Sequence, residues 1–185
     1  MTFTFFRGDS RTPQEIRDAK GFQGWVPLSA EQARKIVIKG KKEASDFPPA
    51  LAGIMNTVEI KKALDLQVFI KFTKNKSTTP QVSTAFDDDC GGQANGKDAK
   101  GRPYVIYKLQ FDSLNVLLDN GGFRPLEAGD LPHTSMFPKV LMNDSKLETS
   151  TTIAICMKDE VAFLTSIPMA NIKEYKEQGA GWKSM

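Results

Sequence analysis

The pattern of hydrophobic and polar residues divides the chain into a helical first part and a strand-rich second part. The chain opens with an apolar, aromatic run that is typical of a buried strand. Thr12 then begins a short helix, because Pro13 suits the first helical position and Glu15 completes a capping box. We expect this helix to end near Lys20, with Gly21 as the residue after its C-cap.

Two further helices are expected before the strands begin. Ser29 caps the first of them with Gln32 as its box partner, and the helix runs to about Ile38. Apolar residues at a loosely helical spacing predict the other over residues 48–66.

The rest of the chain reads as strands rich in β-branched and aromatic residues. The predicted strands cover residues 68–72, 81–86, 104–111, 139–142, 151–157, 161–164 and 167–168, followed by a short polar tail. A polar, glycine-rich loop spans residues 87–103. Helices first and strands afterwards predict an α+β fold, and 185 residues are most simply one domain over residues 1–185.

Composition excludes several classes of protein. The hydrophobic share of 40% and the charged share of 25% are ordinary for a globular domain. A net charge of +3 without a basic run does not argue for binding to nucleic acid or membrane. The sequence has no apolar stretch of membrane-spanning length and no signal peptide, so we expect no membrane partner. The chain begins directly in a strand, which leaves open that it is an excised part of a longer protein.

Cysteines and acidic residues give little evidence of redox or metal chemistry. Cys90 and Cys156 are too few for a disulfide scaffold, and Cys156 lies in an apolar run that predicts a buried thiol. Cys90 and His133, the lone histidine, form only a weak nucleophile pair. The aspartates at residues 87–89 fit no EF-hand spacing, so no metal is predicted.

The junction between the first strand and the first helix suits a diphosphate. Arg7 and Arg11 offer planar donor forks, and a helix start adds free N–H groups and positive potential. Asp9 would orient Arg7, and the alternative is that the two form only a structural ion pair.

Three separated segments carry a more specific signal: residues 6–16 (FRGDSRTPQEI), 82–85 (VSTA) and 160–172 (EVAFLTSIPMANI). In this order they resemble motifs of the bacterial mono-ADP-ribosyltransferase toxins of the cholera and pertussis type. The first resembles the family's aromatic-Arg-x-Asp-Ser-Arg-Pro-Pro-x-Glu-Ile opening, with Thr12 in place of a proline. The second stands where the family has Ser-Thr-Ser, with Ala85 in place of the last serine. The third resembles the catalytic glutamate with Ile-Pro and Asn-Ile at the family's spacing.

The resemblance extends from Phe3 to about Tyr175, and it includes an aromatic-rich strand at residues 104–107. It implies the ADP-ribosyltransferase fold, a split β-sandwich of two roughly perpendicular sheets flanked by N-terminal helices. It also implies cleavage of the nicotinamide–ribose bond of NAD+ and transfer of ADP-ribose to an acceptor. NAD+ is then a substrate, and no metal is needed.

The same resemblance assigns roles to single residues. Glu160, Arg7 and Ser83 would be catalytic: Glu160 stabilises an oxocarbenium-like transition state, Arg7 holds the diphosphate or ribose, and Ser83 hydrogen-bonds Glu160. The expected NAD+-binding residues are Arg7, Gly8, Asp9, Ser10, Arg11, Ser83 and Thr84. The alternative for Glu160 is an ordinary surface glutamate beside Asp159. The alternative for Ser83 is a strand serine without a role in the reaction.

Lys158 bears on the acceptor. It stands two residues before Glu160, where arginine-modifying members of the family have Glu and other members often have Gln. Because a lysine repels a guanidinium, Lys158 argues against an arginine acceptor and favours an acceptor with negative charge nearby or a Thr or Ser hydroxyl. The alternative is that Lys158 points away and neighbouring residues bind the acceptor. Glu148, in the loop at residues 143–152, is a remote candidate for the missing carboxylate.

The resemblance implies a secreted or injected bacterial effector that acts as a monomer in the cytosol of a target cell. Its partner would be a macromolecule, most simply a protein, with a nucleic-acid acceptor left open. Three alternatives are an NAD glycohydrolase, a catalytically dead binding module, and an integrin ligand displaying residues 7–10 (RGDS). The last needs an exposed mobile loop, whereas this segment adjoins a buried strand.

Overall fold

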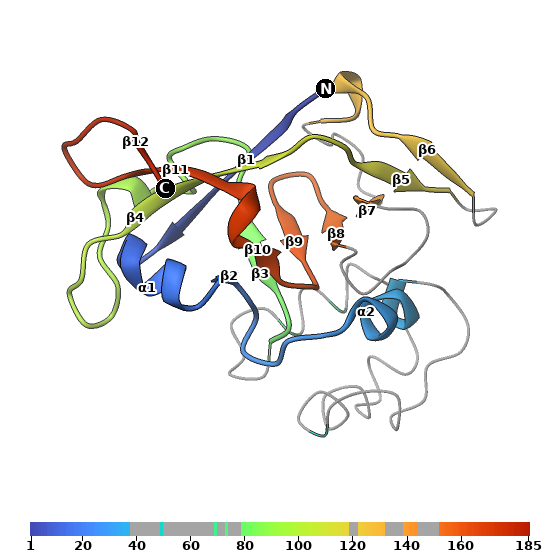
Figure 1. Cartoon of the computed structure of the whole chain (residues 1–185), viewed down its shortest axis with the longest axis horizontal. Helices are drawn as coiled ribbons and strands as arrows, with labels where there is room; N and C mark the ends of the chain where they lie inside the picture. Colours follow the sequence, from blue (N-terminus) through green and yellow to red (C-terminus); the bar gives the residue numbers. More distant parts are fainter. Residues whose placement is uncertain are drawn as a thin grey trace.

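The computed structural model describes residues 1–37, 49, 69, 73, 79–118, 122–131, 139–143 and 152–185. These residues form a mixed α+β fold built mainly from antiparallel sheets (Figure 1). The helices are α1 (Pro13–Asp18) and α2 (Ala30–Val37), with the short 3-10 turns η2 (Gln93–Asn95), η3 (Ala128–Asp130) and η4 (Met169–Asn171).

The first sheet has four strands in the order β1-β4-β11-β12. They are β1 (Phe3–Asp9), β4 (Val105–Phe111), β11 (Ile172–Lys176) and β12 (Lys183–Ser184). β1 and β4 pair along their whole length, from Phe3 opposite Phe111 to Asp9 opposite Val105. Because side chains alternate across a strand, Phe3 and Phe5 enter the core while Phe6 and Gly8 face the other side.

The second sheet has six strands in the order β3-β9-β8-β7-β5-β6. They are β3 (Val82–Thr84), β9 (Val161–Phe163), β8 (Ile153–Cys156), β7 (Lys139–Met142), β5 (Asn115–Leu117) and β6 (Phe123–Pro125). β8 and β9 are buried on both faces, which explains why their sequences, IAIC and VAF, are apolar throughout.

The main core lies between the two sheets, and phenylalanines dominate it. Phe163 of β9 stacks on Phe111 of β4 at 5.2 Å and meets Phe5 of β1 edge-on at 5.9 Å. Such aromatic pairs contribute about 0.5–1.5 kcal/mol beyond their area burial. These contacts therefore fix the two sheets against each other.

A second core covers the opposite face of the six-stranded sheet. Ala33 and Ile36 of α2 are fully buried there and pack with Ile153, Ile155 and Ala162. In Figure 1 the described part of the chain accordingly forms three layers: the β1-β4 sheet, the β9-β8 sheet, and α2 below it.

Two short pairings lie outside the two large sheets. Phe6 and Ala85 form an isolated antiparallel bridge with hydrogen bonds of 2.9 and 2.7 Å, which joins β1 to the end of β3. Residues Gly21–Phe22 form β2 and pair with β10 (Ile167–Pro168). Gly21 has a φ of 120°, and a Cβ there would overlap the carbonyl oxygen of Ile167.

Most of the predicted elements are confirmed, with shorter bounds. The capping boxes at Thr12–Glu15 and Ser29–Gln32 both form. The strand predicted over 104–111 becomes β4, and those over 139–142, 151–157, 161–164 and 167–168 become β7, β8, β9 and β10. The strand predicted over 81–86 forms as β3 plus the bridge at Ala85.

The predicted end of the first helix is wrong by two residues. α1 ends at Asp18 with Ala19 as its C-cap. Lys20, with a φ of 58° in the left-handed region, therefore takes the position after the C-cap that was predicted for Gly21. Gly21 instead starts β2 and pairs with Pro168, and the nearby carbonyl oxygen of Ile167 leaves no room for a side chain.

The strand predicted over residues 68–72 is also wrong where the structure describes it. Phe69 and Thr73 are helical, and the Thr73 hydroxyl donates to the Phe69 carbonyl at 2.8 Å, four residues back. A short apolar run cannot be assigned to strand or helix by its periodicity alone. Of the helix predicted over 48–66, only Pro49 is described, and it is helical; the rest lies outside the described residues.

The polar tail predicted after residue 168 is in fact ordered structure. β11 adds to β4 and β12 adds to β11, although only Ile172 of these two strands is buried. Half-exposed strands lack a clear alternation of apolar residues, and the very short strands β2, β5 and β6 gave no signal either.

Candidate active site

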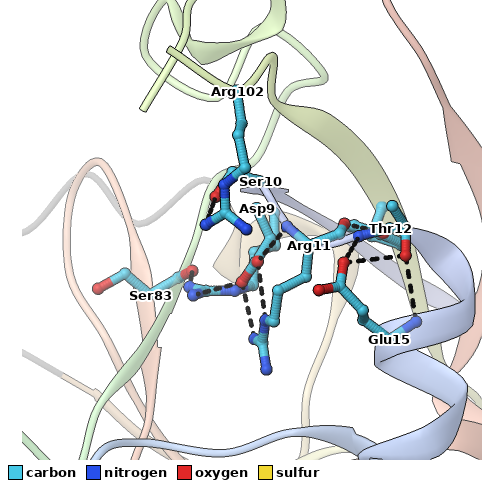
Figure 2. A network of polar contacts seen from close by, with 9 residues as sticks. Asp9, Ser10, Arg11, Thr12, Glu15, Ser83 and Arg102 are labelled. Atoms are coloured by element: carbon cyan, nitrogen blue, oxygen red, sulfur yellow. Dashed lines mark hydrogen bonds and ion pairs between the residues drawn. The ribbon is translucent and has the colours of Figure 1, made fainter. Parts of the chain in front are cut away.

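Arg7, Asp9 and Arg11 form one ion cluster at the end of β1. Figure 2 shows Asp9 and Arg11 of this cluster. Arg7 donates through Nη2 to Asp9 Oδ2 at 3.1 Å. Arg11 donates from Nε and Nη2 to the two oxygens of Asp9 at 2.9 and 2.8 Å, and its backbone N–H adds a third bond at 3.0 Å. Asp9 is buried, whereas Arg7 and Arg11 keep 23% and 32% of their side chains exposed.

The electrostatics of this cluster keep all three groups ionised at neutral pH. Burial would raise the pKa of Asp9, but the contacts with Arg11 and Arg7 outweigh it and hold that pKa below its usual value. Burial lowers the pKa of Arg7, while the hydrogen bond to Asp9 raises the pKa of Arg11. The cluster thus carries one net positive charge, which suits an anionic ligand.

Local sequence explains why the chain turns where it does. β1 ends at Asp9, and Thr12 caps α1 by accepting from the N–H of Glu15 at 3.3 Å. Glu15 in turn accepts from the N–H of Thr12 at 2.6 Å. The predicted phosphate grip by this helix start is therefore not supported, because the Glu15 carboxylate already occupies it and α1 is only six residues long.

The glycine-rich loop 87–103 is tied to the same corner. Arg102 forms an ion pair with Asp98 at 2.9 Å and donates to the Ser10 hydroxyl at 3.0 Å, as Figure 2 shows for Ser10 and Arg102. The Ser10 hydroxyl and backbone N–H groups hold the pKa of Asp98 well below its usual range. Gly8 packs under Gln93 of this loop with no space for a Cβ. Ser10 and Gly8 thus anchor the loop.

The structure brings the three sequence segments together. Arg7 of the first segment donates through Nη1 to the backbone carbonyl of Ser83 in the second segment, at 2.9 Å. Thr84 pairs with Val161, so one step further along this register Glu160 comes opposite Ala85, the residue that bridges to Phe6. Segments about 75 residues apart therefore meet within one short stretch of β3.

Glu160 lies at the base of a tight hairpin. The Met157 N–H donates to the Glu160 carbonyl at 2.8 Å and closes the turn, and the Thr84 hydroxyl, itself buried, donates to the next carbonyl, of Val161, at 2.8 Å. The Glu160 side chain is partly buried, and its Oε1 is shielded from solvent. Lys158 is exposed at the tip of the turn. The predicted hydrogen bond from the Ser83 hydroxyl to Glu160 stays a prediction.

Sequence reasoning missed an aromatic support under the cluster. The Phe22 ring lies below both guanidinium groups, 5.2 Å from Arg7 Cζ and 5.5 Å from Arg11 Cζ. Tyr107 meets Phe22 edge-on at 5.2 Å, and its hydroxyl donates to the Arg11 carbonyl at 2.6 Å. The available signal was weak: a single phenylalanine directly after Lys20 and Gly21.

One atom of Arg7 is left without a protein partner. Its Nε is buried and has no hydrogen-bond acceptor among the described residues. A buried donor without an acceptor costs about 1–3 kcal/mol. An anion bound beside Arg7 would supply the missing acceptor.

The cysteines do not support a nucleophilic site. Cys90 is only half-buried, but burial and then the Asp87 carboxylate raise the pKa of its thiol to about 12. Cys156 is fully buried as predicted, and burial raises its pKa to about 12 as well. His133 and Glu148 lie outside the described residues.

A cleft of about 310 Å³ lies away from this cluster, between residues 88–95 and 176–180, and the predicted site residues do not line it. Two of the acidic side chains there form ion pairs, Asp88 with Lys176 and Glu177 with Lys183, and Asp89 accepts the Gly92 N–H. The described residues contain no acidic, histidine and cysteine group that could hold a metal ion. They also contain no helix that could cross a membrane.

No protein-family model matches this chain, and no curated protein matches its sequence. We therefore infer function from the residues and their geometry.

Proposed function

We propose that this protein is an NAD-dependent mono-ADP-ribosyltransferase with the split β-sandwich of that fold. The observation that carries the proposal is the meeting of the three motif segments: Arg7 on Ser83, and Glu160 opposite the bridge residue Ala85. These segments are far apart in sequence, yet they bring an arginine, a serine and a glutamate to neighbouring backbone positions.

Arg7 and Arg11 are the groups we assign to the NAD+ diphosphate. The positive net charge of their cluster with Asp9 and the unsatisfied Nε of Arg7 support an anionic ligand there. Asp9 orients both arginines. Gly8 and Ser10 act in this proposal through the neighbouring loop, which both of them contact.

Glu160 is the group we assign to the reaction. As the nicotinamide–ribose bond breaks, its electron pair leaves with nicotinamide and positive charge develops on the ribose. A carboxylate beside the ribose stabilises that charge, as in glycoside hydrolysis. The acceptor's nucleophile then forms the new bond to ribose and loses its proton. Ser83 would hold the Glu160 carboxylate, while buried Thr84 fixes the strand.

Lys158 guides the proposal for the acceptor. It is exposed at the turn that leads into Glu160, so it can meet an incoming macromolecule. Its charge disfavours an arginine acceptor and favours a Thr or Ser hydroxyl, most simply on a protein of the target cell. The setting that fits this activity is an injected effector in the cytosol of that cell. The lysine also favours the second candidate, an NAD glycohydrolase in which water replaces the acceptor.

The test is transfer of label from the adenylate part of NAD+ to macromolecules in eukaryotic and bacterial lysates. We expect a labelled band that is lost in Glu160→Gln and kept in Asp159→Asn, the matched carboxylate on the same turn. Nicotinamide release without labelled product would instead support the glycohydrolase. Neither product, together with no protection from thermal unfolding by NAD+, would overturn both.

A further inference from the structure

A buried aromatic ring supports both guanidinium groups of the candidate site. Phe22 is only 1% exposed, and its ring centroid lies 5.2 Å from Arg7 Cζ and 5.5 Å from Arg11 Cζ. A guanidinium within about 6 Å of an aromatic centroid is attracted to the negative face of the ring. One ring therefore serves two cations that are four residues apart.

The position of Phe22 is itself fixed from two sides. It is the second residue of β2, opposite Ile167 of β10, and the glycine before it accepts this pairing only because it has no Cβ. Tyr107 meets the ring edge-on, with an interplanar angle of 73°, and also bonds to the Arg11 backbone. The Ile-Pro pair of the third sequence segment thus acts on the arginines of the first through this ring.

Phe22 and Asp9 both contact the arginines, but they differ in how many arginine N–H donors they leave available for a ligand. Asp9 holds the arginines by accepting N–H groups, and each such bond uses a donor that a phosphate would need. A ring face attracts the cation without accepting one of its in-plane N–H donors. A contact of this kind restrains a guanidinium while its edge stays available to an anion.

We propose that Phe22 is a positioning residue that holds Arg7 and Arg11 for a diphosphate-bearing ligand. This inference rests on the proposed function for the identity of the ligand. In this proposal, the negative potential on the ring face, and not only the volume of the ring, holds the two guanidinium groups in position.

The test replaces Phe22 by phenylalanines carrying one, two and three ring fluorines. These keep nearly the same shape but weaken the negative face step by step. We expect the Kd for ADP-ribose to rise with each fluorine, about fivefold over the series. Binding of adenosine, which lacks the diphosphate, should not change. The same series at Phe163, a buried ring stacked on Phe111, is the matched control and should leave both affinities unchanged.

A second readout does not depend on the ligand. In the free protein, ring currents should displace the Nε–Hε NMR signals of Arg7 and Arg11, and Phe22→Leu should return both to ordinary positions. Equal ADP-ribose affinity across the Phe22 series, or arginine signals unmoved in Phe22→Leu, would overturn the positioning role. If the unmodified protein binds neither NAD+ nor ADP-ribose, the proposed function fails, and the arginine signals still decide whether Phe22 positions the two side chains.

Discussion

Two ion clusters in this molecule have almost the same composition. Asp9 is buried between Arg7 and Arg11, and Asp130 is buried between Arg124 and Lys139. Each carboxylate also accepts one backbone N–H, at 3.0 Å in the first cluster and 2.9 Å in the second. In each, contacts with the cations hold the pKa of the aspartate below its usual value.

The clusters differ in the sequence separation of their partners and in whether a buried donor is left without an acceptor. Every partner of Asp130 in its cluster lies within nine residues of it, so the cluster closes locally at the edge of the six-stranded sheet. Arg7 instead bonds to Ser83, 76 residues away, lies over Phe22, and keeps a buried Nε without an acceptor among the described residues. Ion pairing is common to both clusters, so the proposed ligand site rests on the two features that only the Arg7 cluster shows: its long-range contact with Ser83 and its buried Nε.

The largest contrast is expected from conservative changes to one arginine of each cluster. Arg7→Lys keeps the charge but loses the planar fork, and it should lower transferase activity by about 10²–10³-fold, the range for loss of a key donor in an active site. Arg124→Lys makes the same chemical change in the Asp130 cluster and should leave activity unchanged. Label transfer from NAD+ measures both.

Thermal unfolding of the two variants provides the control. Both should unfold within a few degrees of the unmodified protein, because each keeps its ion pair. An Arg7→Lys protein that is fully folded and fully active would remove Arg7 from the site.

Cys90 lies near the Arg7 cluster and Cys156 near the Asp130 cluster. The next largest expected effect is on the rate at which these two thiols are alkylated. The pKa of Cys90 is raised to about 12, so very little thiolate exists at pH 8. The higher nucleophilicity of a basic thiolate recovers part of the loss, and alkylation by iodoacetamide should be about 50-fold slower than for a free cysteine of pKa about 8.5. Cys156 should not react in the folded state, because it is fully buried.

Mass spectrometry after timed alkylation measures both rates, with the denatured protein as the control. Rapid alkylation of Cys90 together with loss of activity would show a reactive thiol at the Arg7 cluster and contradict the structure.

A smaller effect is expected from acid. An aspartate whose pKa is lowered by folding adds stability that is fully present above its unfolded pKa, about 3.9. That contribution is lost as the pH falls through this value toward the folded pKa. Asp9→Asn and Asp130→Asn should each lower the free energy of unfolding by about 1–2 kcal/mol at pH 7.

Urea unfolding at pH 7, 4 and 3 measures this loss. The difference between each variant and the unmodified protein should shrink as the pH falls, and a difference that stays constant would contradict the assigned ionisation. Only Asp9→Asn should also weaken the binding of ADP-ribose.

The fold could be predicted from the sequence where residues signal strongly in their own neighbourhood. Thr12–Glu15 and Ser29–Gln32 marked two helix starts, and fully apolar runs marked β8 and β9. Phe69 was misassigned because a short apolar run does not distinguish a strand from a helix, and Phe69 is buried in the core that includes α2. β11 and β12 were missed because backbone pairing with β4, a long-range event, builds them from polar residues.

The site shows the same limit. Motif residues Arg7, Ser83 and Glu160 could be proposed from sequence, and the structure places Arg7 on Ser83 and Glu160 one step along the same register. The contact of Phe22 with the arginines could not be predicted from the sequence, because nothing in the sequence indicates that β2 pairs with β10 beneath them. A helix start was expected to grip phosphate, but the glutamate that completes its capping box places a negative charge there.

The smallest expected effect separates the two neighbouring hydroxyls of β3, where the Arg7 cluster makes its long-range contact. Arg7 bonds to the Ser83 carbonyl, so Ser83→Ala keeps that contact and should change the melting temperature very little. If the Ser83 hydroxyl holds Glu160, the same variant should lower activity by about fivefold, the loss of one net hydrogen bond. Thr84→Val removes the buried bond to Val161 and should cost about 1 kcal/mol of stability. Label transfer and thermal unfolding of both variants test this, and a Ser83→Ala protein with full activity would leave the serine with only its backbone role.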